Sequence, residues 1–259
     1  MKKGFALLAA IALLSACGDS NIGGGNDGGA EPRTLTVSAA ASLAEAFTDI
    51  GRTFESQHDG VTVTFNFGPS DGLAGQIDEG APVDVFASAS PTWMDAVETD
   101  GPGVTGRTDF ARNRLAVIVP SENPAGVEGI DDLAEDGVKL VLAAEGVPVG
   151  DYAREALANA GIADAALENV VSNEEDVKGV VTKVVSGDAD AGIVYVTDVT
   201  ADVEDRLKLI EIPDDVNVIA TYPIAVVSGT KEAALAQDFV DLVLGDGQQT
   251  LAGYGFLPA

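Results

Sequence analysis

Residues 37–45 read VSAAASLAE and join two different patterns. The residues from 34 to 39 have the composition of a short β-strand, and the chain then runs directly into a helical pattern. Ser42 stands where a helix N-cap is expected, and Glu45 follows three residues later, which is the spacing of a capping box. Apolar residues then recur at the helical period, at Leu43, Ala46, Phe47, Ile50 and Phe54. The segment therefore predicts a strand that leads into an amphipathic helix.

A helix that starts at the carboxyl end of a strand directs its free amides and the positive end of its dipole out of the sheet. Such a helix start can bind an anion. A single S-x-x-E pattern more often does no more than cap its helix. The functional interpretation of Ser42 therefore depends on whether the same arrangement recurs in the chain.

Strand and helix patterns alternate through the rest of the 259 residues. Strands are expected at 34–39, 61–67, 82–87, 114–120, 139–143, near Val170, at 191–196 and at 222–227. Helices are expected at 42–57, 72–79, around Trp93 to Val97, at 131–135, 150–160, 174–186, 231–244 and 248–254. This alternation indicates an α/β fold whose parallel sheet carries helices on both faces.

The long apolar strand at 114–120 marks the passage into a second lobe, and the strand at 222–227 marks the return. We expect two doubly wound lobes that are joined by two crossing segments. The first lobe comprises residues 34–114 and 225–259, and the second comprises residues 115–224.

The N-terminal residues are typical of an export signal. Lys2 and Lys3 form a basic region, and residues 5–14 form an apolar stretch that is too short to span a bilayer. Residues 1–16 are therefore interpreted as a signal peptide.

The signal ends in LSAC, residues 14–17, which resembles a bacterial lipobox. In that interpretation Cys17, the only cysteine, becomes the lipidated first residue, and residues 17–33 form a flexible tether rich in Gly, Asn and Asp. A plain secretory signal with an incidental cysteine is the alternative. Either interpretation places the protein outside the cytoplasm, and the first holds it at the membrane by its lipid.

The formal net charge of −28 makes nucleic acid and anionic membrane surfaces unfavourable partners. It also repels small anions at long range, although salt screens this effect beyond about 8–10 Å. Any anion site must therefore be local and built from dipoles.

Four predicted strand-to-helix junctions share one design, and two of them lie in each lobe. They are centred on Ser42, on Ser70, on residues 147–152 and on residues 172–177. Facing lobes would bring four positive helix ends to one cleft, at the carboxyl ends of the strands. Each end carries about half a charge, so their sum of roughly +2 suits a doubly charged oxyanion.

These segments contain no Arg or Lys clamp, because Arg154 and Lys178 fall inside helices. The donors would be backbone amides, serine hydroxyls and a tyrosine. Such a site favours a fully deprotonated anion, which only accepts hydrogen bonds, whereas a protonated phosphate also needs an acceptor.

Several motifs recur in the order known from one family. They are AAASL (39–43), GAPVDVF (80–86), WMD (93–95), VPVGDYA (147–153), EDV (175–177), GIVY (192–195) and YGF (254–256). Together they resemble the molybdate-binding proteins that supply bacterial ABC transporters, over the chain from about Thr34 to its end.

The resemblance implies a type II periplasmic-binding-protein fold that closes on one tetrahedral oxyanion, molybdate or tungstate. It implies hydrogen bonds from Ser42 and Ser70, from the backbone amides of Val149 and Val177, and from the hydroxyl of Tyr195. It further implies a monomer that delivers its ligand to a membrane permease, without cofactor, direct metal ligand or catalysis.

Two departures from the family pattern bear on selectivity. Val149 replaces a smaller residue, and Pro69 stands where a small polar residue is common and removes one amide. A receptor for sulfate, thiosulfate or another small oxyanion is therefore the alternative.

Several residues also allow a different functional role or a purely structural one. A secreted serine hydrolase would need His58, the only histidine, near Ser42, yet the two lie at opposite ends of the predicted helix and no nucleophile elbow is present. Trp93 and Met94 are interpreted as packing residues. The acidic runs at 131–132, 174–176 and 214–215 match no calcium-loop spacing and are interpreted as solvated surface.

Overall fold

The computed structural model describes residues 32–259. The predicted signal peptide, Cys17 and all of the predicted tether except residues 32 and 33 lie outside these residues. Within the described part of the chain, no helix is long and apolar enough to cross a membrane.

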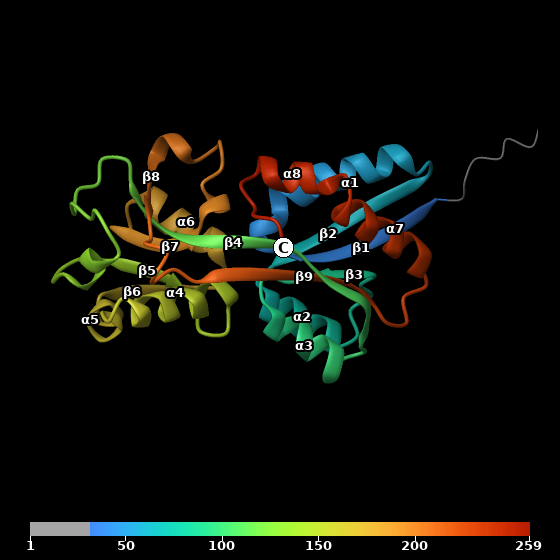
Figure 1. Cartoon of the computed structure of the whole chain (residues 1–259), viewed down its shortest axis with the longest axis horizontal. Coiled ribbons are helices and arrows are strands. Elements are labelled where there is room, and N and C mark those ends of the chain that lie inside the picture. The colour runs from blue at the N-terminus through green and yellow to red at the C-terminus, as the bar shows by residue number, and fades with distance from the viewer. Residues whose placement is uncertain (1–31) are drawn as a thin grey trace, which may run out of the picture.

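Two long strands run through both parts of the molecule (Figure 1). They are β4 (Val104–Pro120) and β9 (Ile219–Val227), which pair antiparallel with each other. The predicted crossing segments lie inside these strands, whose apolar residues are buried on both faces beyond the first residue of each strand, Val104 and Ile219. β4 begins ten residues before the predicted strand, because its first half is mostly exposed and irregular in register and so shows no apolar alternation.

The strands form one mixed sheet in the order β2-β1-β3-β9-β4-β7-β5-β6, and β8 also pairs with β4. Besides β4 and β9, the strands are β1 (Arg33–Ala40), β2 (Val61–Gly68), β3 (Val85–Ala87), β5 (Leu140–Ala143), β6 (Val170–Glu174), β7 (Ala191–Tyr195) and β8 (Leu207–Glu211). We call the part built on β1–β3 the first lobe and the part built on β5–β8 the second lobe.

The expectation of a parallel sheet is right only within each lobe. β1 pairs parallel with β2 and β3, and β5 pairs parallel with β6 and β7. The crossing strands pair antiparallel with β3, β7 and β8. The reason is topological, because a strand that leaves a lobe and one that returns to it run in opposite directions through the same sheet.

Helices cover both faces of the sheet, as expected for an α/β fold. They are α1 (Ala44–Gln57), α2 (Ser70–Asp78), α3 (Pro91–Thr99), α4 (Pro148–Asn159), α5 (Ala163–Glu168), α6 (Val177–Ser186), α7 (Ala233–Leu244) and α8 (Gly247–Gly253). In the first lobe α1, α7 and α8 lie on one face and α2 and α3 on the other (Figure 1). In the second lobe α6 lies on one face and α4 and α5 on the other.

Aromatic side chains fill the core beneath α1. The ring of Phe47 packs against Phe110 at 5.7 Å and against Phe239 at 6.0 Å between centroids. Phe239 belongs to α7, so the C-terminal helices are held on the first lobe by apolar burial. Each such side chain contributes about 1.5–3 kcal/mol through its removal from water.

Some helices begin elsewhere than the sequence pattern indicates. α6 begins at Val177 and not at Glu174, because Glu174 still pairs with Ala143 as the last residue of β6. α2 and α4 each begin two residues earlier than expected, and α5 and β8 were not expected at all. The segments 163–168 and 207–211 are only six and five residues long, which is too short for a period to be recognised.

Candidate functional site

The four predicted junctions meet at a single cavity between the lobes, with an empty volume of about 230 Å³. They follow β1, β2, β5 and β6, so they lie at the carboxyl ends of parallel strands, where open α/β sheets bind ligands. The first lobe contributes Ala40, Ala41, Ser42, Gly68, Pro69, Ser70 and Ala89, and the second contributes Val147, Pro148, Val149, Asp176, Val177 and Tyr195. All five predicted site residues therefore line the same cavity.

Ser42 does not cap a helix, so the predicted capping box is wrong. A 3-10 turn, η1 (Ala41–Leu43), precedes α1, which places Ser42 inside the first turn without a side-chain cap bond. Its hydroxyl instead lies 3.0 Å from the hydroxyl of Tyr222 on β9. Glu45 binds Lys178 of the second lobe, with Nζ 2.9 Å from Oε1.

Asn113 and Tyr222 extend the hydrogen-bond network of the Ser42 hydroxyl. The Asn113 amide donates to Thr197 at 2.8 Å and lies 3.5 Å from the Tyr222 oxygen. Burial raises the pKa of Tyr222, so its phenol keeps its proton and can donate to Ser42. The Ser42 proton is then free to point into the cavity. The sequence interpretation missed Tyr222 and Asn113, whose only signal was a polar group in each crossing segment.

Ser70 is the first residue of α2, and Pro69 before it is the N-cap. The hydroxyl oxygen of Ser70 accepts a hydrogen bond from the amide of Ala89 at 3.0 Å. Because that oxygen is the acceptor, its own proton remains available for a ligand. Pro69 lines the cavity without an amide to donate.

Val149 is the second residue of α4, after Pro148 at the first position. An amide at that position has no acceptor within its helix, so it can donate into the cavity. The first turn of α4 packs closely against the end of the preceding segment, and this depends on Gly150, because a Cβ there would lie 2.2 Å from the carbonyl oxygen of Ala144. A glycine is therefore required for this helix end to reach the cavity.

Val177 is the first residue of α6, and Asp176 is the N-cap. The carboxylate of Asp176 accepts a hydrogen bond from the amide of Gly179 at 2.9 Å. Asp176 lines the cavity, but this bond uses its Oδ1 atom to cap the helix. The sequence interpretation placed the helix start earlier and so missed this cap.

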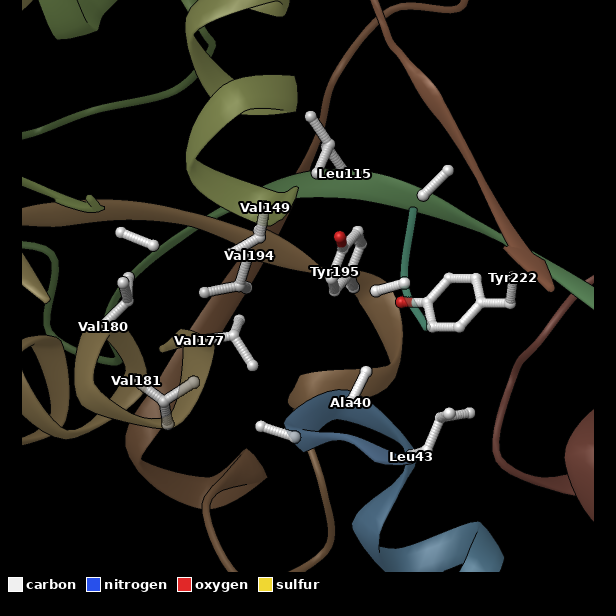
Figure 2. Close-up of a cluster of buried hydrophobic side chains, with 14 of the residues drawn as sticks. Ala40, Leu43, Leu115, Val149, Val177, Val180, Val181, Val194, Tyr195 and Tyr222 are labelled. Carbon is white, nitrogen blue, oxygen red and sulfur yellow. The ribbon is translucent and has the colours of Figure 1, made fainter. Parts of the chain in front are cut away.

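Tyr195 is the last residue of β7, and its side chain is buried between the lobes. Figure 2 shows its ring between Val149 on α4 and Ala40 at the end of β1, with the ring of Tyr222 beside it. The Tyr195 hydroxyl has no hydrogen-bond partner among residues 32–259. Burial raises its pKa well above the ordinary value, so it remains a donor at neutral pH. A buried hydroxyl without a partner indicates that a ligand supplies one.

Two polar contacts join the lobes beside the cavity. Lys178 of α6 binds both carboxylate oxygens of Glu45, and the indole Nε1 of Trp93 donates to the carbonyl oxygen of Gly146 at 2.8 Å. The interpretation of Met94 as a packing residue is confirmed by its full burial. Trp93 packs only partly, and it also joins α3 to the loop before α4.

The structure does not bring together the residues of a serine hydrolase site. His58 lies just past the C-terminal end of α1, where its Nδ1 atom is 2.9 Å from the carbonyl oxygen of Phe54. Ser42 lies before the other end of that helix, so the two cannot form a catalytic pair. Across residues 32–259, no group of three or more His, Cys, Asp or Glu side chains could hold a metal ion.

Comparison with known proteins gives a consistent result. The molybdate-binding protein ModA of Mycobacterium tuberculosis is 37% identical over 248 residues, which are 95% of this chain and 93% of that protein. ModA of Escherichia coli is 35% identical over 236 residues, or 88% and 90% of the two chains. The solved periplasmic molybdate-binding protein of Azotobacter vinelandii has the same fold, with a TM-score of 0.77 and 22% identity over 87% of this chain and 99% of that one.

A family model described as bacterial extracellular solute-binding protein matches residues 35–257. This range includes both lobes, both crossing strands and every residue that lines the cavity. The chain therefore belongs to the family of bacterial extracellular solute-binding proteins.

Proposed function

We propose that this protein captures molybdate, and also tungstate, in the cavity between its lobes and delivers the anion to an ABC transporter permease. The observation that carries the proposal is the buried, unpartnered hydroxyl of Tyr195, which lines a cavity together with four helix or turn starts. Relatives named as molybdate-binding proteins, at 35–37% identity, support the choice of ligand.

The anion would be held by hydrogen-bond donors alone. Ser42 and Ser70 donate from the first lobe through hydroxyls whose oxygens already have partners. Val149 and Val177 donate backbone amides from the first turns of α4 and α6, where the helix dipoles add positive potential. Bonds to a charged acceptor contribute about 1.5–3 kcal/mol each, so these groups support tight binding despite the acidic surface.

Binding would proceed from an open form to the closed form seen here. The anion first meets Ser42 and Ser70, and closure about β4 and β9 then brings Val149, Val177 and Tyr195 onto it. The closed form presents a surface that a permease can recognise, so the ligand drives a population shift.

The donor set selects against protonated anions. Among residues 32–259, Asp176 is the one acidic residue that lines the cavity, and its Oδ1 atom accepts a hydrogen bond from the amide of Gly179. A protonated phosphate would therefore have only the second oxygen of this helix-capping carboxylate as a side-chain acceptor, whereas molybdate, tungstate and sulfate need none. Selection between these three depends on cavity size, to which the side chains of Val149 and Pro69 contribute. Sulfate or thiosulfate remains the second candidate.

We further propose that the protein acts outside the cytoplasm as a monomer, anchored through a lipid on Cys17, and that it performs no catalysis. The extracellular description of its family supports the location. The anchor rests on the LSAC sequence at residues 14–17. Mass spectrometry of the membrane fraction tests it, because a lipidated N-terminus at Cys17 is expected and a soluble, unmodified chain would contradict it.

Thermal unfolding with molybdate, tungstate, sulfate and phosphate in turn tests the ligand. A ligand at 100 times its dissociation constant adds about 2.7 kcal/mol to the free energy of unfolding, which raises the Tm by several degrees. We expect a shift with molybdate and tungstate and none with phosphate. A shift with sulfate alone would move the assignment to the second candidate, and no shift with any anion would refute both.

A further inference from the structure

A fully buried carboxyl group lies directly behind the proposed anion site. Asp198 ends the 3-10 turn η3 (Val196–Asp198), three residues after Tyr195. Its Oδ2 atom accepts a hydrogen bond from the backbone amide of Tyr195 at 3.0 Å. Its Oδ1 atom has no hydrogen-bond partner among the described residues. A buried carboxylate that lacks full compensation is costly in its charged form.

The charged groups around Asp198 do not neutralise it. Lys178 from α6 has its Nζ atom 4.0 Å from Oδ1, but that ammonium group is already bound to Glu45 from α1. Asp176 at the N-cap of α6 adds a second nearby negative charge, and the phenols of Tyr195 and Tyr222 face the group without charge. Burial is the main cause that raises the pKa of Asp198 to about 7.

We infer that Asp198 is a positioning residue of the anion cavity, and that it takes up a proton from solvent when a doubly charged anion occupies that cavity. The inference rests on the proposed function. The hydrogen bond that the amide of Tyr195 donates to Oδ2 holds the backbone of a residue that lines the cavity. The same carboxyl group brings a negative charge next to that residue whenever it is ionised.

A bound anion and the ionised carboxylate of Asp198 repel each other, and the protein interior screens this repulsion weakly. An anion in the cavity makes the ionised form of Asp198 less favourable, because both groups lie next to the buried residue Tyr195, where charges are weakly screened. The bound state therefore holds the proton more tightly than the free state does. By linkage, affinity falls as pH rises through the range in which Asp198 ionises, about tenfold for each unit by which the anion raises its pKa. Asp198 gains at most one proton per site, and no covalent bond to the anion forms.

Calorimetric titration of the whole protein with molybdate tests the inference. Titration near pH 7 in two buffers of different ionisation enthalpy gives the number of protons taken up on binding. We expect a fraction of one proton, and an affinity that falls about tenfold between about pH 6 and about pH 8.5. Molybdate remains doubly charged over this range, so the anion itself contributes no titration.

Three variants distinguish the effect of the Asp198 charge from the effect of its hydrogen bond to the Tyr195 amide. Asp198→Asn keeps an acceptor for the Tyr195 amide and removes the charge, so it should bind without proton uptake and independently of pH. Asp198→Ala removes the acceptor and should weaken binding at every pH. Asp202→Asn is the matched control, because it removes the same charge from an exposed carboxylate in the following loop and should keep the wild-type pH profile.

The possible failures are distinguishable. Wild-type binding that is flat with pH and takes up no proton would overturn the inference and leave the proposed function intact. Proton uptake that persists in Asp198→Asn would assign it to another group and would also overturn the inference. If the wild-type protein bound neither molybdate, tungstate nor sulfate, the proposed function would fail and this inference with it.

Discussion

The indole nitrogen of Trp93 in the first lobe donates a hydrogen bond to the carbonyl oxygen of Gly146 in the second lobe, at 2.8 Å. Gly146 has a φ of +88°, which glycine adopts without strain, and so the carbonyl can turn toward the indole. The bond lies between α3 and the loop that leads into α4, and α4 carries Val149. It therefore joins the first lobe to the loop that positions the start of α4.

Trp93 is the only tryptophan in the chain, so its fluorescence should report closure directly. Opening of the lobes breaks the bond to Gly146 and exposes the indole to water. We expect molybdate to shift the emission of the open protein toward shorter wavelength, with a dependence on concentration that matches calorimetry. An emission spectrum unchanged at saturating anion would show that binding does not close the lobes around Trp93.

Tyr195→Phe should weaken anion binding without harming the fold. The hydroxyl has no partner among the described residues, so its removal costs no existing bond and leaves folding stability unchanged or slightly higher. Loss of one charge-assisted bond should weaken affinity by about 1.5–3 kcal/mol, or roughly 10- to 150-fold. Isothermal titration and thermal unfolding measure the two quantities.

Tyr254→Phe is the control for Tyr195→Phe. The Tyr254 hydroxyl donates to Asp49 at 2.7 Å, and Tyr254 does not line the cavity. The Tyr254→Phe variant should lose a little folding stability and keep its anion affinity, whereas Tyr195→Phe should keep its stability and lose affinity. Equal affinity losses in the two variants would argue that Tyr195 does not donate to the anion.

Replacement of Ser42 and Ser70 together by Ala should cost several kcal/mol of binding free energy, because each serine supplies a charge-assisted bond. Some stability should also be lost, since Tyr222 and the Ala89 amide lose their partners. Titration with molybdate measures the first effect and chemical denaturation the second. Unchanged affinity in the double variant would remove both serines from the site.

Lys178→Met should weaken the binding of every anion by the same factor. Lys178 joins α6 to Glu45 across the cleft and does not line the cavity, so it acts on closure and not on recognition. The pair is about one-third exposed on each side, which limits its effect to about 0.2–1 kcal/mol, or up to about fivefold in affinity. Lys183→Met, which breaks an ion pair inside the second lobe, is the matched control. A changed ratio between molybdate and sulfate affinities would contradict this role.

Asp198 should make the unliganded protein less stable as pH rises from about 4 to about 7. Its pKa is raised from 3.8 to about 7 in the folded state, so the native protein binds a proton that the unfolded chain releases. The stability that this bound proton contributes is fully present below the pKa of Asp198 in the unfolded chain. It is lost as the pH rises to the pKa of Asp198 in the folded protein. Its upper size is about 4 kcal/mol. Urea denaturation of wild type and Asp198→Asn across this range should show a steeper decline in the wild type; parallel profiles would contradict it.

The sequence was sufficient to find the four junctions because each combines a strand pattern, a turn residue and a helical period within about twenty residues. Ser42, Ser70 and the two second-lobe junctions line the cavity for that reason, whereas the choice of Val149, Val177 and Tyr195 came from the resemblance to the molybdate-binding family. The fold class follows from the same alternation. Local sequence patterns thus predicted which segments surround the cavity.

Groups that depend on pairing between distant segments were not predicted. Tyr222 reaches Ser42 only because β9 returns beside β4, and Asp198 acquires its buried position only where η3 packs against β4 and α6. The capping box failed for a related reason, because a 3-10 turn before α1 turns Ser42 toward Tyr222. The antiparallel crossing strands likewise depend on the path of the whole chain and not on any local period.

Crystals grown with molybdate and measured at the molybdenum absorption edge would test the central claim most directly. The account predicts one strong anomalous peak inside the cavity, with oxygen atoms within hydrogen-bond distance of Ser42, Ser70, Tyr195 and the amides of Val149 and Val177. A peak elsewhere on the protein, or an empty cavity at saturating molybdate, would contradict it.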